Sequence, residues 1–97
     1  MKTTLPPVFQ VAAPDASMSP RIHEGTLVQF STGMRPKAGD GVLVQDAAGQ
    51  AFIRVFRERS HGRWEAHPLN EAYRPLDSQD DQLTVLAVLT GVMGRWA

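Results

Sequence analysis

Cysteine is absent from the 97 residues, which excludes disulfides, thiolate metal sites and cysteine nucleophiles. An excess of charge is also absent, because ten basic and ten acidic residues cancel. The chain therefore lacks the overall positive field that would draw it to nucleic acid or to an anionic membrane. No apolar run approaches the length of a membrane-spanning helix, and Lys2 is followed by polar residues and Pro6-Pro7, unlike a signal peptide. We expect a soluble cytoplasmic protein without membrane contact.

The length and composition are those of an ordinary globular domain. A chain of this size has one core, so we expect a single domain over residues 1–97, with residues 1–7 as an N-terminal tail. Its hydrophobic fraction of 42% argues against disorder. A single functional site is therefore the most that we look for.

Short runs rich in Val, Leu, Ile and Phe are separated by glycine and proline, which is typical of a mostly-β domain. The last run is dense in Leu and Val, which favours a strand covered on both faces, either in the core or at a subunit contact. The only helical turn that we expect follows Ser17, where Ser17 or Ser19 can cap and Pro20 suits the first turn. Strands are predicted over residues 8–11, 26–30, 42–45, 51–57, 64–67 and 83–92, and the segment 69–77 is expected to be irregular.

The histidines and the acidic residues near the end of the chain do not predict a metal site. No histidine pair has metal-ligand spacing with a carboxylate beside it, and "DSQDDQ" lacks the spacing and the glycine of a calcium loop. We expect solvent-exposed structural roles for His23, His61 and His67, and neither a metal nor another cofactor.

Ser17 lies in a polar turn, "DASMSPRIHEG", which leads from one predicted strand into the next. At the start of a helical turn its neighbouring backbone N–H groups, those of Ser17 and Met18, are free to form an oxyanion hole. A serine that merely caps the turn has the same surroundings. The residues alone leave both interpretations open.

Four segments in order make the chain resemble the C-terminal domain of LexA and lambda-type phage repressors, which share a fold and a Ser-Lys dyad with bacterial signal peptidases. They are "DASMSPRIHEGTLVQF", "PKAGDGVLVQDAAGQAFIRVF", and "AHPLNEAYRPL" followed by "LTVLAVLTGVMGRW". The resemblance covers nearly all of the chain from about Val8. It implies a LexA/signal peptidase-like fold: small twisted β-hairpins and a partly open barrel.

The resemblance places the nucleophile at Ser17 and the general-base lysine at Arg54, where this sequence departs from the family. A guanidinium stays protonated at physiological pH and has no lone pair to accept a proton. Arg54 is instead available to bond Ser17 or a nearby carbonyl. The two lysines, Lys2 and Lys37, lie in the tail and in a loop. No Ala-Gly or Cys-Gly pair precedes Ser17, so we do not expect self-cleavage at the family's usual site.

The resemblance also implies the family's other role, dimerisation that aligns two helix-turn-helix domains on an operator. We expect a homodimer that meets DNA only through a separate N-terminal helix-turn-helix domain. The C-terminal run "LTVLAVLTGV" suits a two-fold contact. The interface residues that we predict are Leu86, Val88, Val92 and Trp96, with Met93 as a further anchor.

Two alternatives remain open from the sequence. The first is an active serine peptidase that cleaves itself or another protein, with Ser17 working with a base other than Arg54. The second is a small β-barrel binding module unrelated to repressors.

Overall fold

The computed structural model of the chain describes residues 5–95, and within them every regular element is a strand. The prediction of a mostly-β fold is confirmed. The strands are β1 (Val8–Ala12), β2 (Thr26–Ser31), β3 (Gly41–Gln45), β4 (Ala51–Glu58), β5 (Trp64–His67), β6 (Leu76–Asp77) and β7 (Thr84–Arg95). Five of these strands differ from their predicted runs by one to three residues at an end, and β5 has the predicted bounds. The short β6 corrects the expectation of an irregular segment, since it pairs with β5 through Ala66↔Leu76.

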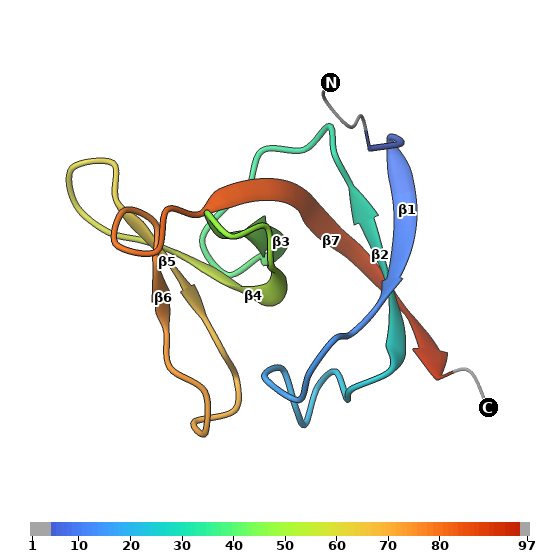
Figure 1. Cartoon of the computed structure of the whole chain (residues 1–97). Coiled ribbons are helices and arrows are strands. Elements are labelled where there is room, and N and C mark those ends of the chain that lie inside the picture. Colours follow the sequence, from blue (N-terminus) through green and yellow to red (C-terminus); the bar gives the residue numbers. More distant parts are fainter. Residues whose placement is uncertain (1–4, 96–97) are drawn as a thin grey trace.

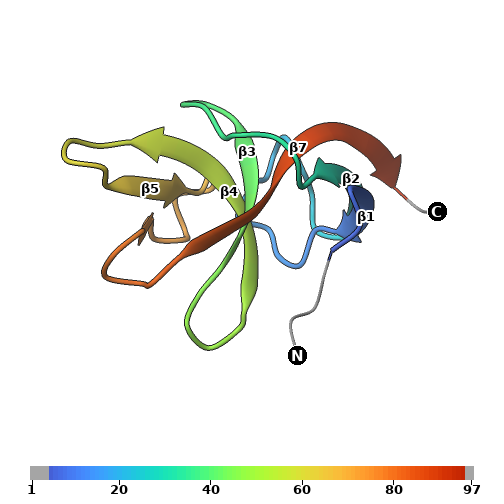
Figure 2. The same cartoon turned by 90° about the horizontal axis from the view of Figure 1, so that it is seen from above.

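All pairings in the sheet are antiparallel, and the strand order is β1-β2-β7-β3-β4-β5-β6. The last strand of the chain thus lies in the interior of the sheet. Figure 1 shows β7 running from the side of β5 and β6 across to β1 and β2. Seen from above, the β3–β4 hairpin occupies the middle, with β5 to one side and β1 and β2 to the other (Figure 2).

Strand β7 divides its length between two neighbours. It pairs with β3 from Thr84 to Val88 and with β2 from Val88 to Arg95. Irregularities in register interrupt both ladders, which bends and twists a strand locally. Because of this division, β7 connects the two halves of one curved sheet.

The core consists of two apolar clusters on opposite faces of the central strands. Leu43 belongs to one cluster, while its neighbours Val42 and Val44 belong to the other. Ala87 and Val88 of β7 divide in the same way. Strands buried on both faces carry continuous apolar runs, which explains the density of Val and Leu in this part of the sequence.

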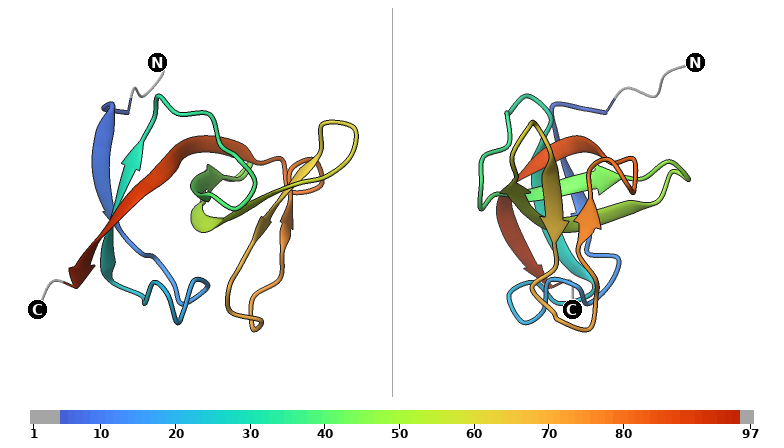
Figure 3. Two further views of the ribbon diagram at one scale, coloured as in Figure 1. Left: turned by 180° about the vertical axis from the view of Figure 1, so that it is seen from behind. Right: turned by 90° about the vertical axis from the view of Figure 1, so that its left-hand side faces the viewer.

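The turn that contains Ser17 and the loop between β5 and β6 meet at one end of the molecule. Figures 1 and 3 show both segments at the bottom of the views, beyond the ends of the strands. The backbone N–H groups of Leu69 and Asn70 both donate to the carbonyl of Ser17, each at 2.9 Å. Residues more than fifty positions apart therefore form one site.

Candidate functional site

Ser17 is held in the turn between β1 and β2 by local hydrogen bonds. Its N–H donates to Asp15 Oδ1 at 2.9 Å, the bond of an Asx turn. The N–H of Ile22 donates to the carbonyl of Met18 at 2.9 Å and closes a single helical turn. The short helical turn expected after Ser17 thus has one bond and goes no further. The Ser17 side chain points inward, and the residue is 1% exposed.

Arg54, on β4, reaches Ser17 with its guanidinium. Nη1 donates to Ser17 Oγ at 2.5 Å and to the Ile53 carbonyl at 3.0 Å. The Ser17 hydroxyl donates in turn to the same carbonyl at 3.4 Å. The structure therefore brings together the two residues that the family resemblance assigned to the nucleophile and base positions. The serine oxygen accepts a hydrogen bond from a cation and faces no proton acceptor on Arg54.

The guanidinium is enclosed by two aromatic rings and one carboxylate. Its carbon lies 5.2 Å from the centre of the Phe52 ring and 5.6 Å from that of Tyr73, within the range of cation–π attraction. Asp15 Oδ1 lies 3.8 Å from Nη1. Burial lowers the pKa of Arg54 below its ordinary value, and the charges of Asp15 and Tyr73 oppose this shift. An arginine starts from so high a value that it keeps its proton.

One buried donor of Arg54 lacks a partner in the described part of the chain. Nε is buried without a hydrogen bond among the described residues, although buried donors are normally paired because desolvation is costly. The guanidinium thus carries an unfavourable contribution that the contacts of Nη1 and the two rings offset. Arg54 is held in place by this environment and by its bond to Ser17.

The segment 67–73 fixes the turn from the other side. Besides the two N–H groups that bond the Ser17 carbonyl, Asn70 Nδ2 donates to the Ala16 carbonyl at 3.1 Å. The Ala16 N–H donates to the Tyr73 hydroxyl at 3.3 Å. Tyr73 therefore contacts both the turn and Arg54, so this segment positions both members of the pair.

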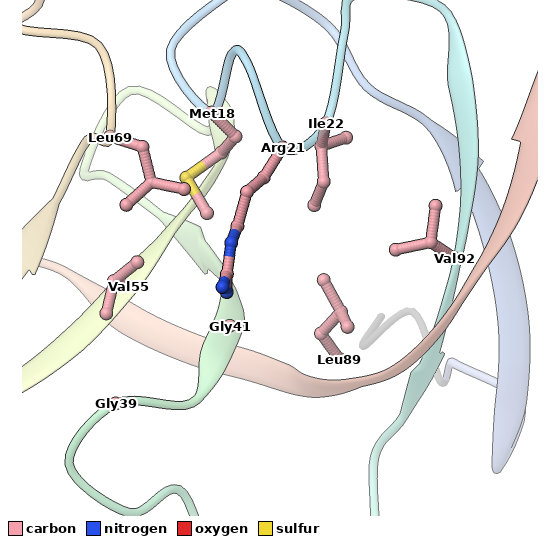
Figure 4. A pocket seen from close by; sticks show the side chains of 9 residues that line it. All are labelled: Met18, Arg21, Ile22, Gly39, Gly41, Val55, Leu69, Leu89 and Val92. Atoms are coloured by element: carbon pink, nitrogen blue, oxygen red, sulfur yellow. The ribbon is translucent and has the colours of Figure 1, made fainter.

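A groove of about 520 Å³ lies beside the pair. Met18 and Val55, the chain neighbours of Ser17 and Arg54, contribute to its wall, but Ser17 and Arg54 do not line it. Figure 4 shows Arg21 extending across it from the turn, with the side chains of Ile22 and Leu89 nearby. The groove thus adjoins the site without exposing the serine hydroxyl.

Both residues that were predicted to supply oxyanion donors, Ser17 and Met18, are buried. The Ser17 N–H already donates to Asp15, and Met18, which is 4% exposed, lines the groove with its side chain.

Of the predicted interface residues, Leu86 packs against the apolar cluster that contains Leu43. Val88 is 1% exposed, which corrects its placement at an interface, because consecutive buried residues on β7 put it in the core.

Val92 is the predicted interface residue that the structure places at the surface, with 51% of its area exposed, and Met93 beside it is 52% exposed. Trp96, the fourth residue of the predicted interface, lies outside the described residues.

The residues that surround Arg54 were not singled out from the sequence. Asp15 carried a local signal. Pro14 and Asp15 in succession favour a turn, and an aspartate side chain in a turn often accepts the N–H two residues further on. Asn70 and Tyr73 belong to the family-like segment, but their contacts depend on a loop far along the chain. Phe52 had no signal beyond its place two residues from Arg54 on the same strand, where side chains share a face.

The remaining titratable residues do not add to the site. Lys37 lies exposed in the loop before β3, where its N–H donates to Asp40 Oδ2 at 2.8 Å, and Lys2 lies outside the described residues. His67 is partly buried, so it is less exposed than expected, and its Nε2 is 2.6 Å from Glu65 Oε1. Across residues 5–95, no group of three or more histidine or acidic side chains is placed to hold a metal ion.

The fold and the site together define a small all-β domain in which a turn serine accepts a hydrogen bond from an arginine on the following hairpin. The sequence matches the family model described as Peptidase S24-like over residues 1–90. The chain belongs to this family, part of the LexA/signal peptidase superfamily, as its resemblance to LexA and phage repressors implied. A comparison with curated proteins found no match. In the described part of the chain, no helix has the length and hydropathy required to cross a membrane.

Proposed function

We propose that this chain is the dimerisation and regulatory domain of a LexA-like or phage-repressor-type transcription regulator in the cytoplasm, with a peptidase site that no longer cleaves. The observation that carries the proposal is the hydrogen bond from Arg54 Nη1 to Ser17 Oγ at 2.5 Å. Membership of the Peptidase S24-like family supports the repressor-type setting. DNA binding belongs to a separate helix-turn-helix domain in this proposal, in accord with the neutral charge of the chain.

The chemistry at Ser17 opposes catalysis in two ways. Activation of a serine requires a neighbouring base that takes its proton, and the guanidinium offers donors only. The Ser17 N–H, a candidate oxyanion donor, already bonds the Asp15 carboxylate. A negatively charged intermediate would have to displace that carboxylate, so both the attack and the stabilisation of the oxyanion are impaired.

The exposed end of β7 supports the dimerisation part of the proposal. From Leu89 onward, one edge of β7 has no strand beside it in the described chain, because its pairing with β3 ends at Val88. Val92 and Met93 lie on this stretch and are both about half exposed. An unpaired strand edge with exposed apolar side chains favours association with a second chain.

A fluorophosphonate probe tests the proposed loss of catalysis, because it labels only an activated serine. The wild type, Ser17→Ala, Arg54→Lys and the double variant would be incubated with the probe at neutral and alkaline pH and analysed by intact mass. We expect no adduct on the wild type at any pH. Arg54→Lys introduces an amine that can lose its proton when buried, so we expect an adduct that grows with pH and disappears in the double variant.

Labelling of the wild type at Ser17 would contradict the proposal and favour an active peptidase with another base. Circular dichroism spectra of the four proteins serve as the control that each one is folded.

A further inference from the structure

The methionine side chains of this chain differ widely in exposure. Met18 is 4% exposed, whereas Met34 is 50% and Met93 is 52% exposed, and Met1 lies outside the described residues. Oxidation of a thioether to a sulfoxide replaces an apolar group by a polar one. Among the described methionines, Met34 and Met93 are therefore the two that an oxidant in solution can readily reach.

Met93 owes its exposure to an irregularity in the pairing of β7 with β2. Leu27 of β2 pairs with Gly94. The next residue of β2, Val28, pairs with Val92, so Met93 has no partner on that strand. An extra residue of this kind is a β-bulge, which interrupts the alternation of side chains between the two faces of a strand. The bulge explains why the consecutive residues Val92 and Met93 are both about half exposed.

The bulge lies on the part of β7 that has an unpaired edge. The pairing of β7 with β3 ends at Val88, and Figure 1 shows the far end of β7 at the margin of the molecule. Strand β7 carries no charged side chain before Arg95. The sulfur of Met93 therefore belongs to the apolar surface that is proposed for dimerisation, whereas Met34 lies in the loop between β2 and β3.

We infer that Met93 makes association through β7 sensitive to peroxides, an inference that rests on the proposed dimerisation. A lone pair of the Met93 sulfur attacks one oxygen of hydrogen peroxide, the O–O bond breaks, and a sulfoxide and one molecule of water form. The sulfur is oxidised by two electrons, which the peroxide takes up. Burial of a polar sulfoxide against an apolar partner surface is costly, so the oxidised chain associates less tightly.

Oxidation acts on the monomer, because an interface shields its residues from solvent. A dimer in equilibrium with its monomers is therefore oxidised while it is dissociated, and the sulfoxide then hinders reassociation. Methionine sulfoxide reductases reverse the change: thiols supply two electrons, and the oxygen leaves as water. The oxidation state of Met93 thus controls association reversibly.

Treatment of the chain with hydrogen peroxide at high dilution, then concentration to tens of micromolar and analytical ultracentrifugation, tests the inference. Peptide mapping by mass spectrometry locates the added oxygen. We expect sulfoxide at Met34 and Met93 but not at Met18, and a dimer dissociation constant roughly tenfold above that of the untreated chain. Met93→Leu keeps an apolar side chain without sulfur, so its dimer should resist peroxide. Met34→Leu is the matched control and should weaken as the wild type does.

A dimer that is unaffected although Met93 carries the sulfoxide would overturn the inference and leave the proposed dimerisation intact. The same weakening in Met93→Leu, or a Met93 that stays unoxidised while Met34 is oxidised, would overturn it as well. An untreated wild type that is monomeric at this concentration would instead contradict the proposed dimerisation and the inference with it. Incubation of the oxidised wild type with methionine sulfoxide reductases and a thiol should restore the dimer.

Discussion

Asp15 Oδ1 lies 3.8 Å from Nη1 of the buried Arg54 guanidinium, within ion-pair distance. The same oxygen accepts the N–H of Ser17. Asp15 therefore has two roles, which separate on substitution: Asp15→Asn keeps an oxygen acceptor for the turn but removes the charge that faces Arg54.

We expect Asp15→Asn to lower the free energy of unfolding by about 1 kcal/mol, the range of a partly exposed charge contact. In an Arg54→Met background the same substitution should have almost no effect, because its countercharge is gone. Urea denaturation of the two single variants and the double variant measures this coupling. An equal loss in both backgrounds would show that the role of Asp15 is confined to the turn.

Arg54 itself should be replaceable by an apolar side chain of similar length. Arg54→Met removes a buried charge and the unpaired Nε while it still fills the space between the two rings, so we expect stability within about 1 kcal/mol of the wild type or above it. Arg54→Ala leaves a cavity, and we expect a loss of about 2–4 kcal/mol. Thermal and urea unfolding distinguish the two. A loss of the larger size for Arg54→Met would indicate that the charge network stabilises the fold.

Gly41, the first residue of β3, permits the close packing of β3 on β7. A Cβ atom at this position would lie 2.9 Å from Leu89 Cδ1 and 3.0 Å from Leu89 Cβ. We expect Gly41→Ala to destabilise the chain by about 1–3 kcal/mol through overpacking, and Leu89→Ala to remove most of this additional cost. Gly33→Ala is the control, since nothing lies within 4 Å of its Cβ position. Equal effects of the two alanines would contradict this account.

Stability should fall in acid because hydrogen-bonded arginines lower the pKa values of carboxylates in the folded chain, Glu65 and Asp81 among them. The hydrogen bond from Arg59 lowers the pKa of Glu65, and that from Arg74 lowers the pKa of Asp81. The unfolded chain takes up these protons at higher pH than the folded chain. The stabilisation is therefore complete above about pH 5 and is lost as pH falls through the lowered folded values.

Unfolding free energies measured between about pH 6 and pH 2 check this expectation. Asp81→Asn and Arg74→Gln should each flatten the acid part of the profile, because each removes the same pair. A profile parallel to that of the wild type in both variants would exclude a contribution from this pair.

Association through β7 predicts that a charge at Val92 disrupts a dimer. We expect Val92→Asp to shift the sedimentation coefficient of the chain toward that of a monomer at tens of micromolar, because an unpaired charge in an interface is costly. Val8→Asp is the matched control: Val8 is 55% exposed but lies on the edge strand β1, which pairs with β2 and not with β7. A wild type that is already monomeric at this concentration would count against the proposed interface.

The sequence predicted most strands because turns and apolar runs are local features, but it did not identify the surroundings of the site. Strand β6 escaped prediction because two residues cannot show a periodicity, and it exists through its pairing with β5. Val88 was placed at an interface because a strand covered on both faces has the same apolar density in a core. The positions of Ser17 and Arg54 came from the family resemblance, whereas Phe52 and Tyr73 meet Arg54 only in the folded chain.

The two bonds from Leu69 and Asn70 to the Ser17 carbonyl have a consequence for the order of folding. They join an early turn to a segment that a ribosome makes about fifty residues later, and closing so long a loop costs entropy before the contacts form. While the chain is being synthesised, Ser17 and Arg54 can both be present without the loop that fixes them. The site is therefore completed late, and its hydrogen-exchange protection should report the docking of residues 67–73.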